Sequence, residues 1–152
     1  MAHHLTLGMR TEVVFRYPAE FVPLSADDGI LSASACEWFL RLLRRVADLR
    51  VEEKIIQEDW GAAIKVARGS HRFWIGLSMW PEGDSAWLAH VHHSGFALLQ
   101  RFSGSGKREF KRLIGDLDRV LHLDPSATEI AWYSKNDLLG TNPNVRPHPE
   151  NA

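Results

Sequence analysis

The chain has 152 residues, a length typical of one domain and sufficient to bury a core without disulfides. Its 18 basic and 19 acidic residues give a net charge of −1, which provides no broad positive field for a nucleic acid. The lone cysteine excludes an internal disulfide and a four-cysteine zinc site. The sequence shows neither a signal peptide nor a membrane-spanning apolar run, so we expect a cytoplasmic protein and no membrane partner.

Alternating apolar residues predict a first strand over 11–17, which ends at Pro18. A helix is predicted over 34–49, and Ser34 with Glu37 three residues later has the spacing of a capping box at its start. The apolar stripe of this helix consists of Phe39, Leu42, Leu43, Val46 and Leu49.

The middle of the chain predicts a run of strands joined by short turns. The strands are expected over 51–59, 60–67, 72–80 and 85–93, and residues 96–102 could extend or follow the last of them. The segments "RGSH" (68–71) and "PEGD" (81–84) have the composition of turns. Because short turns join antiparallel neighbours, this part of the sheet should be antiparallel.

A second helix is predicted over 107–124 and a final strand over 127–134. Strands clustered between two helices favour an α+β fold over an alternating α/β fold. We expect a two-layer sandwich, with a mostly antiparallel sheet of about five to six strands and two helices packed on one face. Residues 1–134 should form this single domain, and residues 135–152 a loosely ordered tail.

Side chains alternate along a strand, so the middle strands predict a core face and an opposite face. The predicted core set is Trp60, Ala62, Ile64, Val66, Phe73, Ile75, Leu77, Met79, Trp87, Ala89 and Val91. The opposite face would carry the candidate binding residues Lys65, Trp74, Ser78, Trp80, His90 and His92. An aromatic patch rimmed by polar groups is typical of an interaction surface. Alternatively, the tail, the loop before the first helix or a second subunit could cover this face.

The histidines of "WLAHVHH" (87–93) raise the question of a metal site. His90 and His92 share one strand face, and imidazole suits zinc, copper, iron or nickel. A third ligand would have to come from His71, Asp59 or Glu58, whose distance the sequence does not give. We therefore favour a polar strand face and expect no metal and no cofactor, with His93 pointing to the other side.

The sequence offers weak support for catalysis. In "SGSGK" (103–107), Arg101 stands where a phosphate-binding loop needs glycine, and Arg108 stands where it needs serine or threonine. No "GxSxG" nucleophile motif is present. Cys36 lies in the first turn of a predicted helix, where the dipole could lower a thiol pKa, but packing against Phe39 is the simpler interpretation. No catalytic residue is predicted.

The stretch "EDWGAAIKVARGSHRFWIGLSMWPEGDSAWLAHV" (58–91) resembles small bacterial proteins of uncharacterised function that share an EDWG…FWIG…W core. Some of those proteins are suspected immunity or accessory proteins. The likeness covers about a quarter of the chain, and its motifs are structural. It implies a stand-alone cytoplasmic protein that binds another protein, and it carries over no functional residue.

Together these patterns predict a non-enzymatic cytoplasmic binding protein that uses the Trp74, Trp80, His90 and His92 face. The expected partner is another protein or a second copy in a homodimer, and not a nucleic acid. Two alternatives stay open. One is a metal-binding protein or hydrolase that uses His90 and His92 with a nearby carboxylate, and the other is a carrier of a small ligand.

Overall fold

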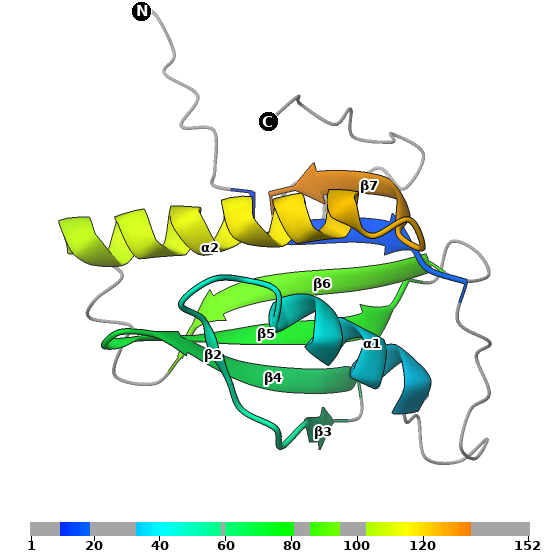
Figure 1. The fold of residues 1–152 in the computed structure, drawn as a ribbon, viewed down its shortest axis with the longest axis horizontal. Coiled ribbons are helices and arrows are strands. Elements are labelled where there is room, and N and C mark those ends of the chain that lie inside the picture. The colour runs from blue at the N-terminus through cyan, green and yellow to red at the C-terminus, as the bar shows by residue number, and fades with distance from the viewer. Residues whose placement is uncertain (1–9, 19–32, 59, 81–85, 95–102, 135–152) are drawn as a thin grey trace, which may run out of the picture.

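A computed structural model describes residues 10–18, 33–58, 60–80, 86–94 and 103–134. Over these ranges the chain forms seven strands and two helices (Figure 1). In chain order they are β1 (Glu12–Arg16), α1 (Ala33–Leu43), β2 (Arg50–Val51), β3 (Ile56–Glu58), β4 (Gly61–Arg68), β5 (His71–Met79), β6 (Ala86–His93), α2 (Gly104–Leu123) and β7 (Thr128–Tyr133). The strands form one antiparallel sheet in the order β2-β4-β5-β6-β1-β7, and β3 also pairs with β4.

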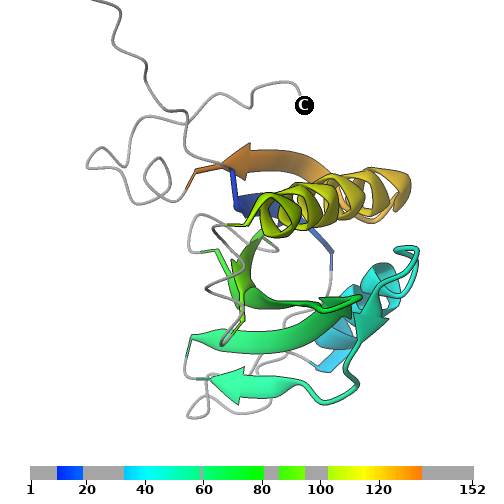
Figure 2. The same cartoon turned by 90° about the vertical axis from the view of Figure 1, so that its left-hand side faces the viewer.

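Both helices lie on the same side of the curved sheet (Figure 2). One apolar core fills the space between the two layers, with α1 contributing Phe39 and Leu43, and α2 contributing Leu113 and Leu117. The predicted α+β two-layer sandwich is therefore confirmed. The sheet has seven strands instead of five to six, because the segment expected as one strand over 51–59 forms two.

The break between β2 and β3 arises because this part of the chain has two more residues than the stretch of β4 that it faces. Val51 pairs with Val66 and Ile56 pairs with Ala63, so five steps along one chain oppose three along the other. The two extra residues cannot pair and bend the chain out of the ladder, as in a β-bulge.

The helix α1 departs from the prediction at both ends. Ala33 is already helical, so Ser34 lies inside the first turn and the predicted capping box is wrong. The helix ends at Leu43 and not at residue 49, and the chain tightens through hydrogen bonds from Arg45 N to Leu42 O (3.1 Å) and from Val46 N to Leu43 O (3.0 Å). Such i→i+3 bonds are typical of a last turn. The early end returns the chain to β2 while Val46 stays buried.

Two predicted turns had different outcomes. Arg68 pairs with His71 across a tight turn in which Gly69 has φ +57°, so the turn at 68–71 is confirmed. The turn at 81–84 lies outside the described residues, as do residues 96–102 and the tail over 135–152.

The helix α2 begins at Gly104, after the N-cap Ser103, whose hydroxyl accepts a hydrogen bond from Gly106 N (3.0 Å). Neither described helix combines the length and apolar character needed to cross a bilayer. The indole N–H of Trp132 on β7 donates to Asp118 of α2 at 2.8 Å. This bond attaches the helix to one side of the sheet.

A buried arginine attaches α2 to the other side of the sheet. The Arg68 side chain is 6% exposed, and its Nη2 lies 2.6 Å from Asp116 Oδ2. Its Nη1 lies 3.7 Å from Glu109 Oε2, and Nη2 also donates to the carbonyl of Ala47 (3.3 Å). One side chain of β4 therefore connects α2 to the turn after α1.

Replacing this cation should strongly destabilise the fold. We expect Arg68→Met to lower the free energy of unfolding by about 2 to 3 kcal/mol, because Glu109 and Asp116 Oδ2 would remain partly buried without the guanidinium, and only Asp116 Oδ1 would keep a cation, Arg119. The exposed Arg72 in the same hairpin is the matched control, and Arg72→Met should change stability by about 0.5 kcal/mol or less. Equal losses in urea denaturation of the two variants would contradict this role of Arg68.

Candidate functional site

The three central strands, β4, β5 and β6, divide their side chains between two faces of the sheet. One is the face that both helices cover, and the other, which neither described helix covers, is called the open face below (Figure 2). The predicted core residues that are buried in the structure are Ala62, Ile64, Val66, Phe73, Ile75, Leu77, Trp87, Ala89 and Val91. The alternating residues of the same strands face away from the helices. The open face thus carries the side chains from which a site can be built.

Two residues assigned to the core by alternation are exposed. Trp60 is 45% exposed and Met79 is 57% exposed. Trp60 precedes Gly61, whose φ of +154° and close approach to Leu77 O break the strand pattern. The Trp60 indole therefore lies on the open face, with its centroid 5.2 Å from the His90 ring. Met79 is the last residue of β5, where the core ends.

One cross-strand row supplies the floor of the site. Ala63 pairs with Gly76, Gly76 pairs with His90, and His90 pairs with the buried Glu12 of β1. Residues directly opposite each other in antiparallel strands share a face. A Cβ at Gly76 would lie 2.1 Å from His90 Nε2, so the imidazole lies directly over the glycine. Only glycine leaves room for the ring in this position.

The next row supplies one wall. Trp74 pairs with Lys65 on one side and with His92 on the other. The Lys65 ammonium lies 5.2 Å from the centroid of the Trp74 ring, a cation–π contact that restrains the indole. The rings of His90 and His92 meet edge to face at 4.7 Å.

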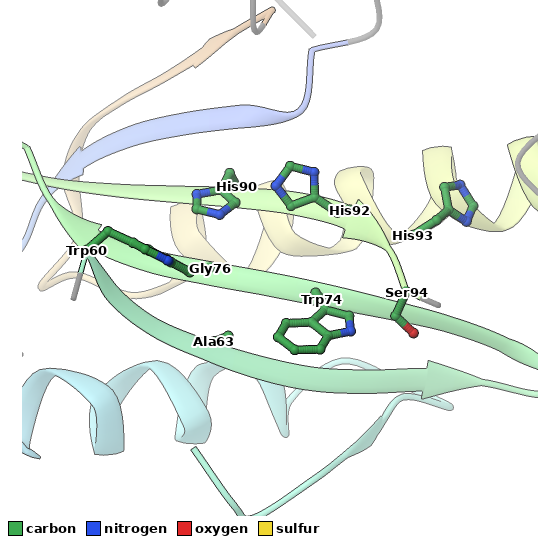
Figure 3. A pocket seen from close by; sticks show the side chains of 8 residues that line it. All are labelled: Trp60, Ala63, Trp74, Gly76, His90, His92, His93 and Ser94. Atoms are coloured by element: carbon green, nitrogen blue, oxygen red, sulfur yellow. The ribbon is translucent and has the colours of Figure 1, made fainter. Parts of the chain in front are cut away.

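These rows form a pocket of about 370 Å³ on the open face (Figure 3). Its lining consists of Trp60, Ala63, Trp74, Gly76, His90, His92, His93 and Ser94. Small residues form the floor, and indole and imidazole rings stand around it (Figure 3). No lining side chain carries a permanent charge. The pocket can stack a flat group and form hydrogen bonds to its rim.

His93 joins the pocket to the second layer. Its ring stacks on Phe110 of α2 with centroids 4.7 Å apart, and it lies 5.1 Å from Phe73. Its alternation with His92 places it toward the helices, as the sequence predicts. The pocket therefore ends where the sheet meets α2.

The structure brings together part of the binding set predicted from the sequence. Trp74, His90 and His92 line the pocket, and Lys65 contacts it through Trp74. Ser78 and Trp80 are half-buried but do not line it. Their place is taken by Trp60, which the sequence reasoning assigned to the core. The sequence feature that could have revealed the exposure of Trp60 is Gly61 directly after it, because glycine in a strand pattern often marks a bulge.

None of the proposed third ligands that the structure describes completes a metal site with the histidine pair. His71 stands at the hairpin end of β5 opposite Arg68, Glu58 is exposed on β3, and Asp59 lies outside the described residues. Within the described ranges, no three or more histidine, cysteine or acidic side chains are arranged to hold a metal ion. Glu12, although in register with His90, does not complete such a group.

Cys36 does not have the environment of a reactive thiol. Its side chain is buried in the core, and burial together with the nearby Glu37 raises its pKa from 9.0 to about 11. This shift outweighs any lowering by the helix dipole. The structure therefore supports packing as the role of Cys36.

Comparisons with family models, with curated proteins and with solved structures found no significant match for this chain. The pocket and the surface around it are therefore what point to a function.

The two glycines of the open face should respond differently to alanine. Gly61→Ala should lower the free energy of unfolding by about 2 to 3 kcal/mol, because the new methyl would meet the backbone of Leu77 and the φ angle is unfavourable. Gly76→Ala meets only the His90 ring, which can rotate away, and should cost about 1 kcal/mol or less. In the second variant, NMR should show displaced His90 ring signals. Unmoved signals would contradict the contact.

Cys36 should be almost inert toward alkylation in the folded protein at pH 8 and should react fully in urea, since the thiolate is disfavoured. Between pH 9 and about 11 the unfolded thiol ionises while the folded one stays protonated, so stability falls as pH rises. Cys36→Ala should remove this component of the pH dependence. Labelling of the native protein as fast as of the unfolded protein would show that the thiol is accessible.

Proposed function

We propose that this chain is a non-enzymatic binding protein whose partner is another protein, and that the partner docks on the open face of β4, β5 and β6. The observation that carries the proposal is the exposed Trp60 beside the aromatic pocket. A tryptophan that is 45% exposed on a sheet face buries much apolar area when a partner covers it. Tryptophan is also the residue type most enriched among binding hot spots.

The surroundings of Trp60 support an interface. The Trp60 and Trp74 indoles both line the pocket, and aromatic residues are enriched at protein interfaces. Met79, although exposed, pairs with the buried Trp87 and therefore lies on the helix-covered side of the sheet, outside this surface. The histidines and Ser94 supply polar groups around this apolar centre. The face thus combines an apolar centre with a polar rim.

A second candidate, a carrier of a small ligand, is favoured by one observation. The pocket volume of about 370 Å³ falls within the range of small-molecule sites, which begins at roughly 300 Å³. The same residues would then enclose a free molecule instead of a partner's side chain.

The resemblance to suspected immunity and accessory proteins adds to the proposal. It would make the partner a specific protein in the same bacterial cell, and it would place this chain in the cytoplasm. The buried, unpaired Cys36 is compatible with a reducing compartment. A homodimer through the same face is part of the proposal, since a second copy would also bury Trp60.

Two exposed apolar residues provide a matched test. Light scattering and affinity capture should be carried out with the wild type, Trp60→Ala and Leu123→Ala. Leu123→Ala is the control, because it removes a side chain that is 71% exposed at the end of α2. We expect Trp60→Ala to weaken self-association, or the binding of whichever protein the wild type captures, at least about tenfold. Leu123→Ala should leave both unchanged.

Equal capture by the two variants would contradict docking on this face. A monomeric protein that captures nothing in any form would contradict the protein partner and favour the small-ligand carrier.

A further inference from the structure

We infer that the pocket accepts a flat, uncharged aromatic group with a polar edge, such as a phenol or an indole. In the protein-binding role proposed above, this group is a tyrosine or tryptophan side chain of the partner. A free small aromatic molecule has the same chemistry. The inference concerns the pocket itself, so it can be tested separately from the docking of a protein.

The dimensions of the pocket suit a single flat ring. A volume of about 370 Å³ is near the lower limit of small-molecule sites. The floor is made by Ala63 and Gly76, which pair across β4 and β5 and project little from the sheet. A flat group can therefore approach the backbone between the larger side chains.

The walls of the pocket favour an aromatic group over an aliphatic one. Trp60 lies at one end and Trp74 at the other, with the His90 and His92 rings along the side (Figure 3). Aromatic rings gain additional attraction from offset or edge-to-face contacts with one another. Lys65 restrains Trp74, so a ligand need not order this indole on binding. The pocket is thus partly preorganised for stacking.

The charges around the pocket favour a neutral ligand. Lys65 touches one wall, whereas Glu52 stands opposite Lys65 in the sheet and the buried Glu12 stands opposite His90. These side chains include groups of both signs and none of them lines the pocket, so they offer neither a cation nor an anion a net attraction. A charged group would therefore lose hydration without an opposite charge in the lining. An uncharged group avoids this cost.

The rim of the pocket explains why a polar edge is favoured. Imidazole nitrogens can donate or accept hydrogen bonds, and the Ser94 hydroxyl can do both. A phenol hydroxyl or an indole N–H on the edge of a stacked ring lies where such groups can reach it. A purely apolar ring would gain no hydrogen bond at this rim.

Four small probes with matched shapes test the inference. The probes are 4-hydroxyphenylacetamide, 4-hydroxyphenylacetate, tyramine and cyclohexylacetamide, which are respectively neutral and aromatic, anionic, cationic, and neutral without an aromatic ring. Each is titrated at pH 7.5 into the ¹⁵N-labelled full chain, and the six indole N–H signals are followed by NMR. Trp60→Ala and Trp74→Phe identify the two signals of the pocket.

We expect 4-hydroxyphenylacetamide to shift the Trp60 and Trp74 signals and to bind at least about fivefold more tightly than the other three probes. Trp60→Ala should weaken its binding at least about tenfold. Trp80→Ala, which removes an indole directly after β5 that does not line the pocket, should not weaken it. Unchanged signals of the buried Trp87 would show that each variant is folded.

Tighter binding of tyramine or of 4-hydroxyphenylacetate would overturn the preference for a neutral group. Equal binding of cyclohexylacetamide would overturn stacking, and the absence of any shift would overturn the inference as a whole. If Trp60→Ala abolishes partner capture although no probe binds, the inference fails and the proposed function stands. If the neutral probe binds but no protein is captured, the inference stands and a free aromatic molecule is the ligand.

Discussion

Two helices cover only one face of a single antiparallel sheet, and this arrangement determines the chemistry of every position on the central strands. On β4, β5 and β6, alternate side chains enter the core, and their neighbours face away from the helices. The pairing of these strands then brings residues from distant parts of the chain into rows. Ala63, Gly76, His90 and Glu12 meet in one such row although they span most of the described chain.

Within these rows, the lack of a side chain at Gly76 determines where the His90 ring lies. Gly76 has no Cβ, and the His90 ring occupies the space that a Cβ would need. The ring is thereby held low on the sheet, between Trp60 and His92. On the neighbouring row, the Lys65 ammonium restrains the Trp74 indole. The shape of the pocket therefore depends on contacts within the sheet face and on pairing between strands.

Regular periodicity made most of the fold predictable from the sequence. The strands β1, β4, β5, β6 and β7 and both helices were predicted because each has an apolar pattern that a local window contains. The errors arise where the backbone departs from that pattern. Alternation continued backward through Gly61 predicts Trp60 in the core, and the apolar stripe predicts too long a helix α1 because Val46 is buried beyond the helix end. The burial of Arg68 was not predictable, because Asp116 lies 48 residues away in sequence.

The candidate site, too, was predictable only where it follows from the local alternation of side chains. Alternation alone placed Trp74, His90 and His92 on the open face, which is where they lie. It could not show that Trp80 is excluded from the pocket, because that depends on how the ends of the strands are arranged. The charge of the surroundings also required the pairing of strands, since Glu12 is 78 residues from His90 in the chain.

The break between β2 and β3 has a consequence for how another chain can approach. Strands at the margin of a sheet expose unpaired backbone groups to which a foreign strand can add, and this is a common cause of aggregation. Here that margin consists of a two-residue and a three-residue strand with unpaired residues between them. An added strand would find only short stretches of backbone to pair with. Recognition on this side of the molecule must therefore rely on side chains and not on continuation of the sheet.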